Sequence, residues 1–402
     1  MNPLKEIKQI RFKDFRMIFK LGITFIPAKI YKCFHRDIWT VTEYPENARD
    51  NGYWLFKYIR ENKPEQEVYY PIKKDASDYI KVKDLGNTVE FGGLKHCILY
   101  WASSKYAGTT KYHGFPDERI SAGLFELKIP GFKYVFLNHG FARGHSNIVD
   151  GEKTSYDMLI AMSKKEKEIM INLNNQTEEK VKAIGFCRQD NLWEKESDGK
   201  TVLVMPTWRR WLDYRHQPDP EKTKKIKEAY WKSEYYKQYQ ELINNQELQK
   251  ILEEYNLNLL LYPHGYAQEY LSSFHTDLNR IKVVGKDEYF VQDLLKEAVF
   301  LITDYSSVCC DYAYMKKPMV YFQFDKKEFA KEQYAESEYF TYEKDGFGPI
   351  VFTQKEVLDE LRKACENNFK MDKEYCDRVE KFYGYFGHDH CEKTYQLIKA
   401  LK

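Results

Sequence analysis

The sequence predicts an α/β protein made of two doubly wound domains, each built on a parallel sheet. Short apolar runs alternate with charged stretches of helical character, as parallel strands and their crossover helices do. This pattern stops at a polar seam over 194–200 and then restarts. A chain of 402 residues is also too long for one ordinary core, so about two domains are expected.

The first half contains a series of apolar runs that end in polar residues. Strands are expected over 38–42, 68–70, 97–102, 134–137 and 158–162, with 79–82 a candidate for another. Helices are expected over 53–61 and 164–172. The run over 134–137 ends at Asn138-His139-Gly140, and 97–102 ends at Ser103-Ser104.

The second half repeats the alternation. Strands are expected over 201–205, 257–262, 281–284, 299–302 and 318–322. Helical character is expected over 221–255, 293–297 and 355–402. The chain is therefore divided into four segments: a helix over 1–36, domains over 37–196 and 197–370, and C-terminal helices over 371–402 that pack back on the first domain.

Composition excludes several classes of protein. Apolar residues make up 43% of the chain and aromatic residues 16%, which excludes global disorder. A net charge of +2 argues against a general nucleic-acid binder. The eight Cys include no CxxC pair, so reduced thiols in a cytosolic protein are expected, not disulfides or a metal site. No apolar run reaches the ~18 residues that span a bilayer, and no signal peptide is visible.

The N-terminal segment 1–36 carries a strong excess of positive charge. It holds nine Lys or Arg against Glu6 and Asp14, with apolar residues at helical spacing between them and Pro27 as a break. A basic amphipathic helix can lie on an anionic membrane surface. It can equally be a first helix that packs on the fold and keeps its lysines in water. Both interpretations stay open here.

The stretch Thr303-Asp304-Tyr305-Ser306-Ser307 follows a buried apolar run. Asp and Ser at this place can cap a helix, or can hold a phosphate beside the free N–H groups of its first turn. Ligands bind beyond the carboxyl ends of strands in open α/β sheets. Those ends carry His139, Arg209, His264, Asp304, Ser306 and Ser307, and this convergence favours a ligand.

Each candidate also has a structural interpretation. Thr207 and Arg209 can form a solvated turn, although an Arg fork suits a diphosphate well. Asp304 can be a helix cap, and Asp311 an acid on a helix surface. No GxGxxG or GxxxxGK[ST] motif is present, so a dinucleotide or P-loop site has no support. Taken together, the strand ends predict a nucleotide diphosphate held in a cleft between the halves.

Several blocks resemble the CDP-glycerol glycerophosphotransferase family. They are Thr303–Val308 with Asp311-Tyr312-Ala313, Lys317–Phe322 and Asp325, together with Ala48–Tyr53, Phe56–Ile59, Pro206–Arg209 and Pro349–Val351. The blocks run from about residue 38 to 351. The resemblance implies a GT-B fold, in which two Rossmann-like domains face a central cleft and the second holds most of the donor. It also implies no cofactor and no obligatory metal. The family commonly has Trp-His-Gly-Thr where this chain has Asn138-His139-Gly140-Phe141, which puts the acceptor in question.

The resemblance implies transfer of glycerol phosphate or ribitol phosphate from a CDP-alditol to an acceptor hydroxyl, with release of CMP. The acceptor would be a polyprenyl-diphosphate-linked saccharide of teichoic acid or capsule synthesis, met at the inner face of the cell membrane by a cytoplasmic, peripheral enzyme. The catalytic residues are predicted to be His139, as the base, and His264. The donor-binding residues are predicted to be Thr207, Arg209, Gly285, Thr303, Asp304, Ser306 and Ser307. Further candidates are Arg49, Asp50, Asn51 and Asp311.

Two other functions remain compatible with the residues. A GT-B glycosyltransferase would use a nucleotide sugar, and a catalytically inert scaffold would keep the fold at a membrane surface. The short N-terminal region favours a primase or single-addition enzyme over a polymerase. The residues do not distinguish a CDP-glycerol donor from a CDP-ribitol donor.

Overall fold

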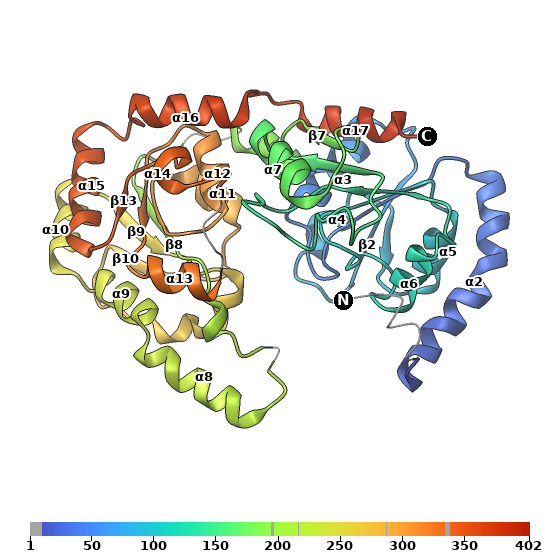
Figure 1. Cartoon of the computed structure of the whole chain (residues 1–402), viewed down its shortest axis with the longest axis horizontal. Helices are drawn as coiled ribbons and strands as arrows, with labels where there is room; N and C mark the ends of the chain where they lie inside the picture. The colour runs from blue at the N-terminus through green and yellow to red at the C-terminus, as the bar shows by residue number, and fades with distance from the viewer. Residues whose placement is uncertain (1–9, 194–196, 216, 287, 334–337) are drawn as a thin grey trace. The chain divides into compact units, whose positions relative to one another are not determined.

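The computed structural model describes residues 10–193, 197–215, 217–286, 288–333 and 338–402. The chain forms two compact units, Met1–Asp190 with Tyr385–Lys402, and Asn191–Gly384. Each unit holds one parallel sheet with helices packed around it (Figure 1). The chain thus leaves the first unit once and returns to it at its C-terminal end.

The first unit is built on a seven-stranded sheet in the order β3-β2-β1-β4-β5-β6-β7. The strands are β1 Trp39–Thr42, β2 Val68–Ile72, β3 Thr88–Glu90, β4 Lys105–Gly108, β5 Lys133–Phe136, β6 Met158–Ala161 and β7 Val181–Ala183. The chain order reverses between β1 and β4, where Thr42 pairs with Gly108. Ligands bind at such a reversal in doubly wound sheets, because the flanking connections leave opposite faces of the sheet there.

Helices cover both faces of this sheet. They are η1 Phe12–Asp14, α2 Phe15–Phe34, α3 Asn51–Asn62, α4 Tyr79–Lys83, α5 Leu94–Ala102, α6 Ile120–Glu126, α7 Lys164–Asn174 and α17 His390–Ala400, with η2 Cys187–Trp193 at the exit from the unit. The core between α5, α6 and the sheet is rich in aromatic rings. Tyr106, Phe115 and Tyr134, for example, lie with ring centroids 5.0 to 6.3 Å apart.

The second unit is built on a six-stranded sheet in the order β10-β9-β8-β11-β12-β13. The strands are β8 Thr201–Met205, β9 Asn258–Leu261, β10 Ile281–Val283, β11 Ala298–Thr303, β12 Met319–Phe322 and β13 Ile350–Val351. The order reverses between β8 and β11, where Met205 pairs with Thr303. The residues that follow these two strands therefore meet at one edge.

The helices of the second unit surround its sheet. They are η3 Arg210–Leu212, α8 Pro220–Lys232, α9 Glu234–Leu242, α10 Gln246–Glu254, η4 Gly265–Ser273, α11 Val291–Glu297, α12 Val308–Tyr314, α13 Lys326–Glu332, α14 Tyr342–Asp345, α15 Gln354–Glu366 and α16 Lys373–Tyr383. The core lies between the sheet and α9, α10 and α15, with Tyr239, Leu248 and Leu361 fully buried.

Three predictions from the sequence, two strands and one helix break, differ from the structure. Residues 97–102, expected to be a strand, belong to helix α5, which lies against α2 and is buried on most sides. An element that is apolar all round shows no period that separates helix from strand. Residues 79–82 are also helical, in α4. Pro27 lies inside α2, because the buried stripe of Leu21, Thr24 and Ala28 packs that helix against the rest of the unit and outweighs one lost hydrogen bond.

The helical stretch over 221–255 is divided by two capping residues. Ser233 accepts a hydrogen bond from the N–H of Tyr236 and begins α9. Asn245 accepts hydrogen bonds from Glu247 and Leu248 and begins α10. Side-chain caps of this kind satisfy N–H groups that a new helix leaves free.

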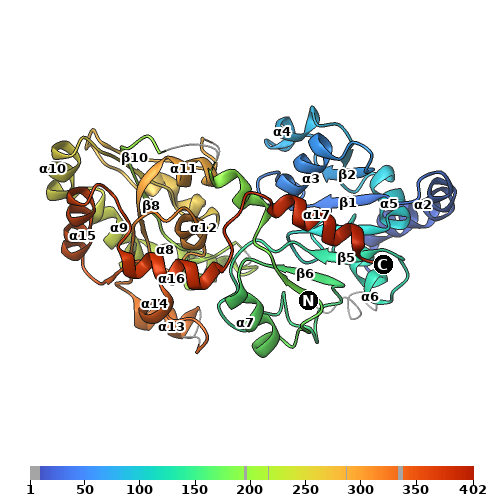
Figure 2. The same ribbon diagram turned by 90° about the horizontal axis from the view of Figure 1, so that it is seen from above.

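The segment 371–402 divides between the units. Helix α16 packs against α12 of the second unit, whereas α17 packs against α3 of the first (Figure 2). The ring of Tyr395 on α17 lies 5.3 Å from that of Trp39 on β1. Only the part after Gly384 therefore belongs with the N-terminal fold, because its apolar face is complementary to α3 and β1.

Candidate active site

His139 lies in a rigid turn directly after β5. The preceding residue, Asn138, has a positive φ of 61° and accepts the N–H of His139 on its own side-chain oxygen at 2.8 Å. The side-chain amide of Asn138 donates to buried Glu166 at 3.1 Å, and its carbonyl accepts from Asn51 at 2.8 Å. Asn tolerates this left-handed conformation better than most residues. The turn is thus held from three sides, and it presents the imidazole at the edge of the sheet.

The ring of His139 has a defined tautomer. Its Nδ1 lies 3.2 Å from the carbonyl oxygen of Thr109, which follows β4. A carbonyl only accepts, so Nδ1 carries the hydrogen and Nε2 is the basic nitrogen of the neutral ring. Desolvation by the surrounding protein lowers the pKa of His139, although the ring keeps an exposed face, and the nearby Asp50 carboxylate raises it. The ring is therefore suited to accept a proton near neutral pH.

Asp50 and Asn51 meet the His139 turn through a residue that the sequence analysis missed. Arg188 donates to Asp50 at 2.6 Å and to the carbonyl of His139 at 2.9 Å, both through Nη1. The N–H of Arg188 donates to the side chain of Asn51 at 3.1 Å. Arg188 lies on η2, about fifty residues from His139 in the chain, in a segment without a motif, so no local signal could have identified it.

The start of α3, which carries Asp50 and Asn51, is held by Glu43. Its buried carboxylate accepts from the N–H groups of Arg49, Asp50 and Tyr53 at 2.7 to 3.0 Å. Burial, followed by the charge of Asp50, raises the pKa of Glu43 to about 7. Gly52 makes this approach possible, since a Cβ there would lie 2.8 Å from the carbonyl of Thr42. The candidate Arg49 turns away and forms a two-nitrogen ion pair with Asp78 at 2.6 and 2.7 Å.

In the second unit, Asp304 organises the strand ends at the reversal. It accepts the N–H of Thr207 at 2.8 Å and the hydroxyl of Tyr239 at 3.2 Å, and it pairs with Arg209 at 2.9 Å. Asp304 is fully buried and does not cap α12. Asp304 therefore ties the loop after β8 to the loop after β11.

The structure gives Arg209 a role other than the one expected. Its guanidinium is fully buried between Asp304 and Asp325, and it also donates to the carbonyl of Thr207 at 2.6 Å. Burial alone would lower the pKa of Arg209, but the two carboxylates raise it well above its ordinary value. The fork predicted for a diphosphate is thus occupied by protein carboxylates, because the charge needs partners once it is buried. Asp325 follows β12 in a block of the family resemblance, without a role assigned there.

Thr207 and the two serines offer hydroxyls at the same edge. The Thr207 side chain is buried, and within the described residues its Oγ1 has no hydrogen-bond partner. Ser306 and Ser307 are half-buried, and Ser306 accepts the N–H of Val308 at 3.3 Å. Ser306 thus contacts the first residue of α12, whereas Ser307, the residue directly before that helix, makes no side-chain cap hydrogen bond.

The remaining candidates lie around this edge with different surroundings. The ring of His264 is 6.5 Å from that of Trp208, and the backbone N–H of His264 donates to the carbonyl of Pro206 at 3.2 Å. Gly285 packs under η4, where a Cβ would lie 2.8 Å from Leu271. The Thr303 hydroxyl is satisfied by the carbonyl of Met205 at 2.7 Å. Asp311 is buried on α12, so the interpretation of this residue as an acid on a helix surface is wrong.

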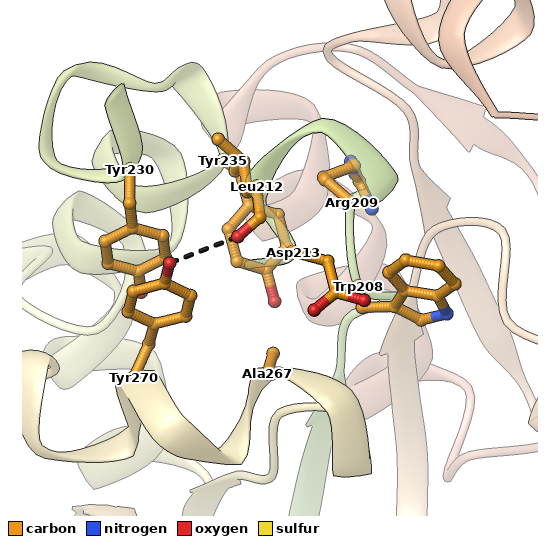
Figure 3. A pocket seen from close by; sticks show the side chains of 8 residues that line it. All are labelled: Trp208, Arg209, Leu212, Asp213, Tyr230, Tyr235, Ala267 and Tyr270. Carbon is orange, nitrogen blue, oxygen red and sulfur yellow. Dashed lines mark hydrogen bonds between the residues drawn. The ribbon is translucent and has the colours of Figure 1, made fainter. Parts of the chain in front are cut away.

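A small pocket lies beside Trp208 and Arg209. Figure 3 shows the Tyr235 hydroxyl and the Asp213 carboxylate pointing into the same space, opposite Ala267. The rings of Tyr230 and Tyr270 stack at 3.6 Å and form one wall. Within the described residues no group of His, Cys, Asp and Glu is arranged to hold a metal ion.

Comparison with known proteins places this geometry in a family. A model of the CDP-Glycerol:Poly(glycerophosphate) glycerophosphotransferase family matches residues 35–400. The chain belongs to this family.

Relatives and solved structures agree with the assignment. The minor teichoic acid biosynthesis protein GgaB of Bacillus subtilis (strain 168) is 28% identical over 376 residues, 92% of this chain and 41% of that protein. The teichoic acid poly(glycerol phosphate) polymerase of the same strain is 24% identical, over 82% of this chain and 44% of that protein. The chain thus spans less than half the length of these relatives.

The fold is shared with the wall teichoic acid polymerase TagF. That structure superimposes with a TM-score of 0.61 at 19% identity, over 97% of this chain and 98% of the other. A TagF variant soaked with CDPG gives a TM-score of 0.59 at 17% identity. The expected GT-B fold of two Rossmann-like units is thereby confirmed.

Proposed function

We propose that this chain transfers glycerol phosphate or ribitol phosphate from a CDP-alditol to a hydroxyl of a lipid-linked acceptor in teichoic acid or capsule synthesis. The support is membership of the glycerophosphotransferase family over residues 35–400, together with the names of its relatives. In the reaction, the acceptor oxygen bonds to the phosphorus of the alditol phosphate. The bond from that phosphorus to the bridging oxygen breaks, and CMP leaves with the electron pair.

The observation that carries the chemistry is the tautomer of His139. Nδ1–H is engaged by the carbonyl of Thr109 at 3.2 Å, which leaves Nε2 to take the proton of the attacking hydroxyl. A base with a pKa near or below neutral is present mostly in its unprotonated form at neutral pH. In this proposal His139, and not a metal ion, makes the acceptor hydroxyl a stronger nucleophile.

The donor side of the proposal rests on the edge between β8 and β11. The Thr207 hydroxyl, Ser306, Ser307 and His264 are proposed to surround the diphosphate, where charge develops as CMP leaves. Arg209 acts there indirectly, because it holds Asp304 and Asp325, which shape the loops. Thr303 and Gly285 support the same loops through the contacts described above.

A donor panel tests the function. Purified protein is incubated with CDP-glycerol, CDP-ribitol and UDP-sugars, each with a polyprenyl-diphosphate-linked saccharide acceptor, and released CMP or UDP is measured with mass spectrometry of the lipid product. The proposal expects CMP and a mass gain of one alditol phosphate. UDP release would identify a nucleotide-sugar glycosyltransferase instead. No nucleotide release with any donor would support an inert scaffold.

We propose in addition that helix α2 brings the enzyme to an anionic membrane surface. One stripe of α2 packs on α5, while Phe12, Phe15 and Phe19 along η1 and α2 are 93, 59 and 67% exposed. Lys13 and Arg16 lie between these rings in the sequence. Exposed aromatic rings beside cations favour the headgroup region of anionic lipids. Packing on the fold and binding to a membrane are therefore compatible, because they use opposite sides of α2. Within the described ranges no helix is long and apolar enough to cross a bilayer.

A further inference from the structure

We propose that Arg188 and Asp50 form a positioning pair, which aims the His139 ring at the acceptor and governs how readily that ring takes a proton. The inference rests on the proposed function, in which His139 is the base. Neither residue is proposed to touch the substrate. Arg188 was not a site candidate from the sequence, and Asp50 was a candidate without a role.

The geometry supports positioning over substrate binding. Nη1 of Arg188 lies 2.6 Å from Oδ1 of Asp50 and 2.9 Å from the carbonyl oxygen of His139. The Arg188 side chain is only 9% exposed, and its guanidinium lies 4.9 Å from the ring centroid of Phe186. A cation held by a carboxylate, a carbonyl and an aromatic ring has little surface left for a phosphate.

The same pair connects three separate elements at the reversal between β1 and β4. Asp50 stands at the N-terminus of α3, where its carboxylate also accepts the N–H of Asn51 at 2.8 Å. Asn51 in turn donates to the carbonyls of Leu137 and Asn138 and accepts the N–H of Arg188. The backbone of His139 is therefore fixed to α3 and η2 as well as to its own strand. A ring on so constrained a turn loses little entropy when it aligns with a nucleophile.

The charges of the pair act on the ring with opposite signs. The groups that face His139 are the carboxylate of Asp50, the guanidinium of Arg188, the imidazole of His113 and the carbonyl of Thr109. Desolvation lowers the pKa of His139 most, Asp50 raises it, and Arg188 lowers it. Because the two charges of the pair oppose each other at the ring, desolvation remains the main cause of the lowered pKa of His139. Loss of either partner should move it in a predictable direction.

The test measures the proton on His139 directly as well as through turnover. The full chain is labelled at its histidine rings, His139 is assigned by its loss in His139→Gln, and its titration is followed by NMR without substrate. Asp50→Asn removes the negative charge and is expected to shift the titration midpoint down by about 0.5 units or more, whereas Arg188→Met should shift it up similarly. The double variant should return towards the wild-type value. Lys133→Met is the matched control, because it removes a cation from an ion pair on β5, the same strand.

The acidic limb of the pH profile for CMP release, measured as kcat/KM, should move with the NMR midpoint in each variant. Arg188→Lys keeps the charge and should hold the midpoint within about 0.3 units while lowering kcat, since its single ammonium cannot serve Asp50 and the His139 carbonyl in the same geometry. Shifts of the same sign in both single variants, or shifts no larger than that of Lys133→Met, would overturn the proposal. If Arg188→Met does not fold, Asp50→Asn decides alone, because Asp50 is one-quarter exposed and Asn nearly matches its shape. If the wild type releases no CMP, the proposed function fails, while the NMR midpoints still decide this inference.

Discussion

Nε and Nη2 of Arg209 donate to the two carboxylate oxygens of Asp325, at 2.6 and 3.2 Å. The pair is buried beneath the edge of the second sheet, and Tyr305 also donates its hydroxyl to Asp325 at 3.1 Å. Asp304 completes the set on the opposite side of the guanidinium. One buried cation thus holds the loops that follow β8, β11 and β12.

Replacement of this cation should destabilise the second unit strongly. Arg209→Met leaves two buried carboxylates without a counter-charge, and we expect the free energy of unfolding to fall by about 3–5 kcal/mol. Urea denaturation monitored by Trp fluorescence measures the loss. Lys237→Met is the control, because its pair with Glu234 is about half exposed on both sides and should contribute less than about 1 kcal/mol. An Arg209→Met protein as stable as the control, but with weak donor binding, would restore the direct diphosphate role.

Thr207 and Thr303 should respond oppositely to the same substitution. The Thr207 hydroxyl is buried without a partner, so Thr207→Val should leave stability unchanged or improve it, because an unmet hydroxyl is removed. The KM for the CDP-alditol should rise by about tenfold or more, the effect of one lost hydrogen bond to a charged group. Thr303→Val breaks the bond to the Met205 carbonyl and should cost about 1 kcal/mol of stability with little change in KM. Thermal unfolding and steady-state CMP release on both variants separate the two roles. An unchanged KM in Thr207→Val would show that this hydroxyl does not bind the donor.

His139→Ala should abolish most turnover without loss of donor affinity. General-base catalysis typically contributes about 100-fold or more, so kcat for CMP release should fall at least by that factor. Donor binding, measured by calorimetry with the CDP-alditol alone, should stay within about twofold, because the base acts on the acceptor. His145→Ala is the control, since His145 is half-exposed in the same unit and pairs with Asp150. A His139→Ala variant that keeps more than about a tenth of the turnover would exclude His139 as the base.

Stability should depend on pH through His96, a buried residue outside the candidate site. Its Nδ1 accepts the N–H of Gly92 at 3.0 Å, and its Nε2 lies 2.9 Å from the Tyr106 hydroxyl, which donates to Gly114. Burial lowers the pKa of His96 from 6.5 to about 3. Between these values the unfolded chain binds a proton that the folded chain does not, so the folded state loses stability as pH falls.

The expected slope is up to about 1.4 kcal/mol per pH unit for this one proton. Urea unfolding of the wild type and of His96→Gln, at a series of pH values from about 6.5 down to about 4.5, measures the difference between their slopes. The buried acids Glu43 and Glu166, whose pKa values burial raises to about 7, act in the opposite direction in both proteins and cancel in the comparison. Parallel slopes for the two proteins would show that His96 is protonated in the folded state or that its site opens to water.

Membrane binding should depend on the exposed rings of η1 and α2. Substitution of Phe12, Phe15 and Phe19 by Ser removes apolar area that the fold does not use, so thermal stability should hold while cosedimentation with anionic liposomes falls severalfold. Ile80→Ser is a control for an exposed apolar residue elsewhere in the same unit, at 60% exposure. Wild-type binding to neutral liposomes should be weaker than to anionic ones, and equal binding to both would argue against the basic residues as contributors.

The periodicity of the sequence was sufficient for the class of fold and for most strands. The runs that became β1, β5, β8 and β11 are apolar, short and followed by polar residues, which is a local signal. Segment 97–102 carries the same signal and is nevertheless helical, because a helix buried between α2 and the sheet is as uniformly apolar as a buried strand. The ends of the strands likewise located His139, Thr207 and the 303–307 stretch, since function in this fold gathers where parallel strands end.

The sequence by itself determined which residue types stand at the strand ends, because the alternation of apolar and polar residues is set along the chain. Only the tertiary structure decided which of them face a ligand and which face one another. Arg209 and Arg188 have the same charge, yet the first is held by Asp304 and Asp325 and the second by Asp50 and the His139 carbonyl. Their carboxylate partners lie between 95 and 138 residues away, and a buried charge takes whichever carboxylate the fold brings to it.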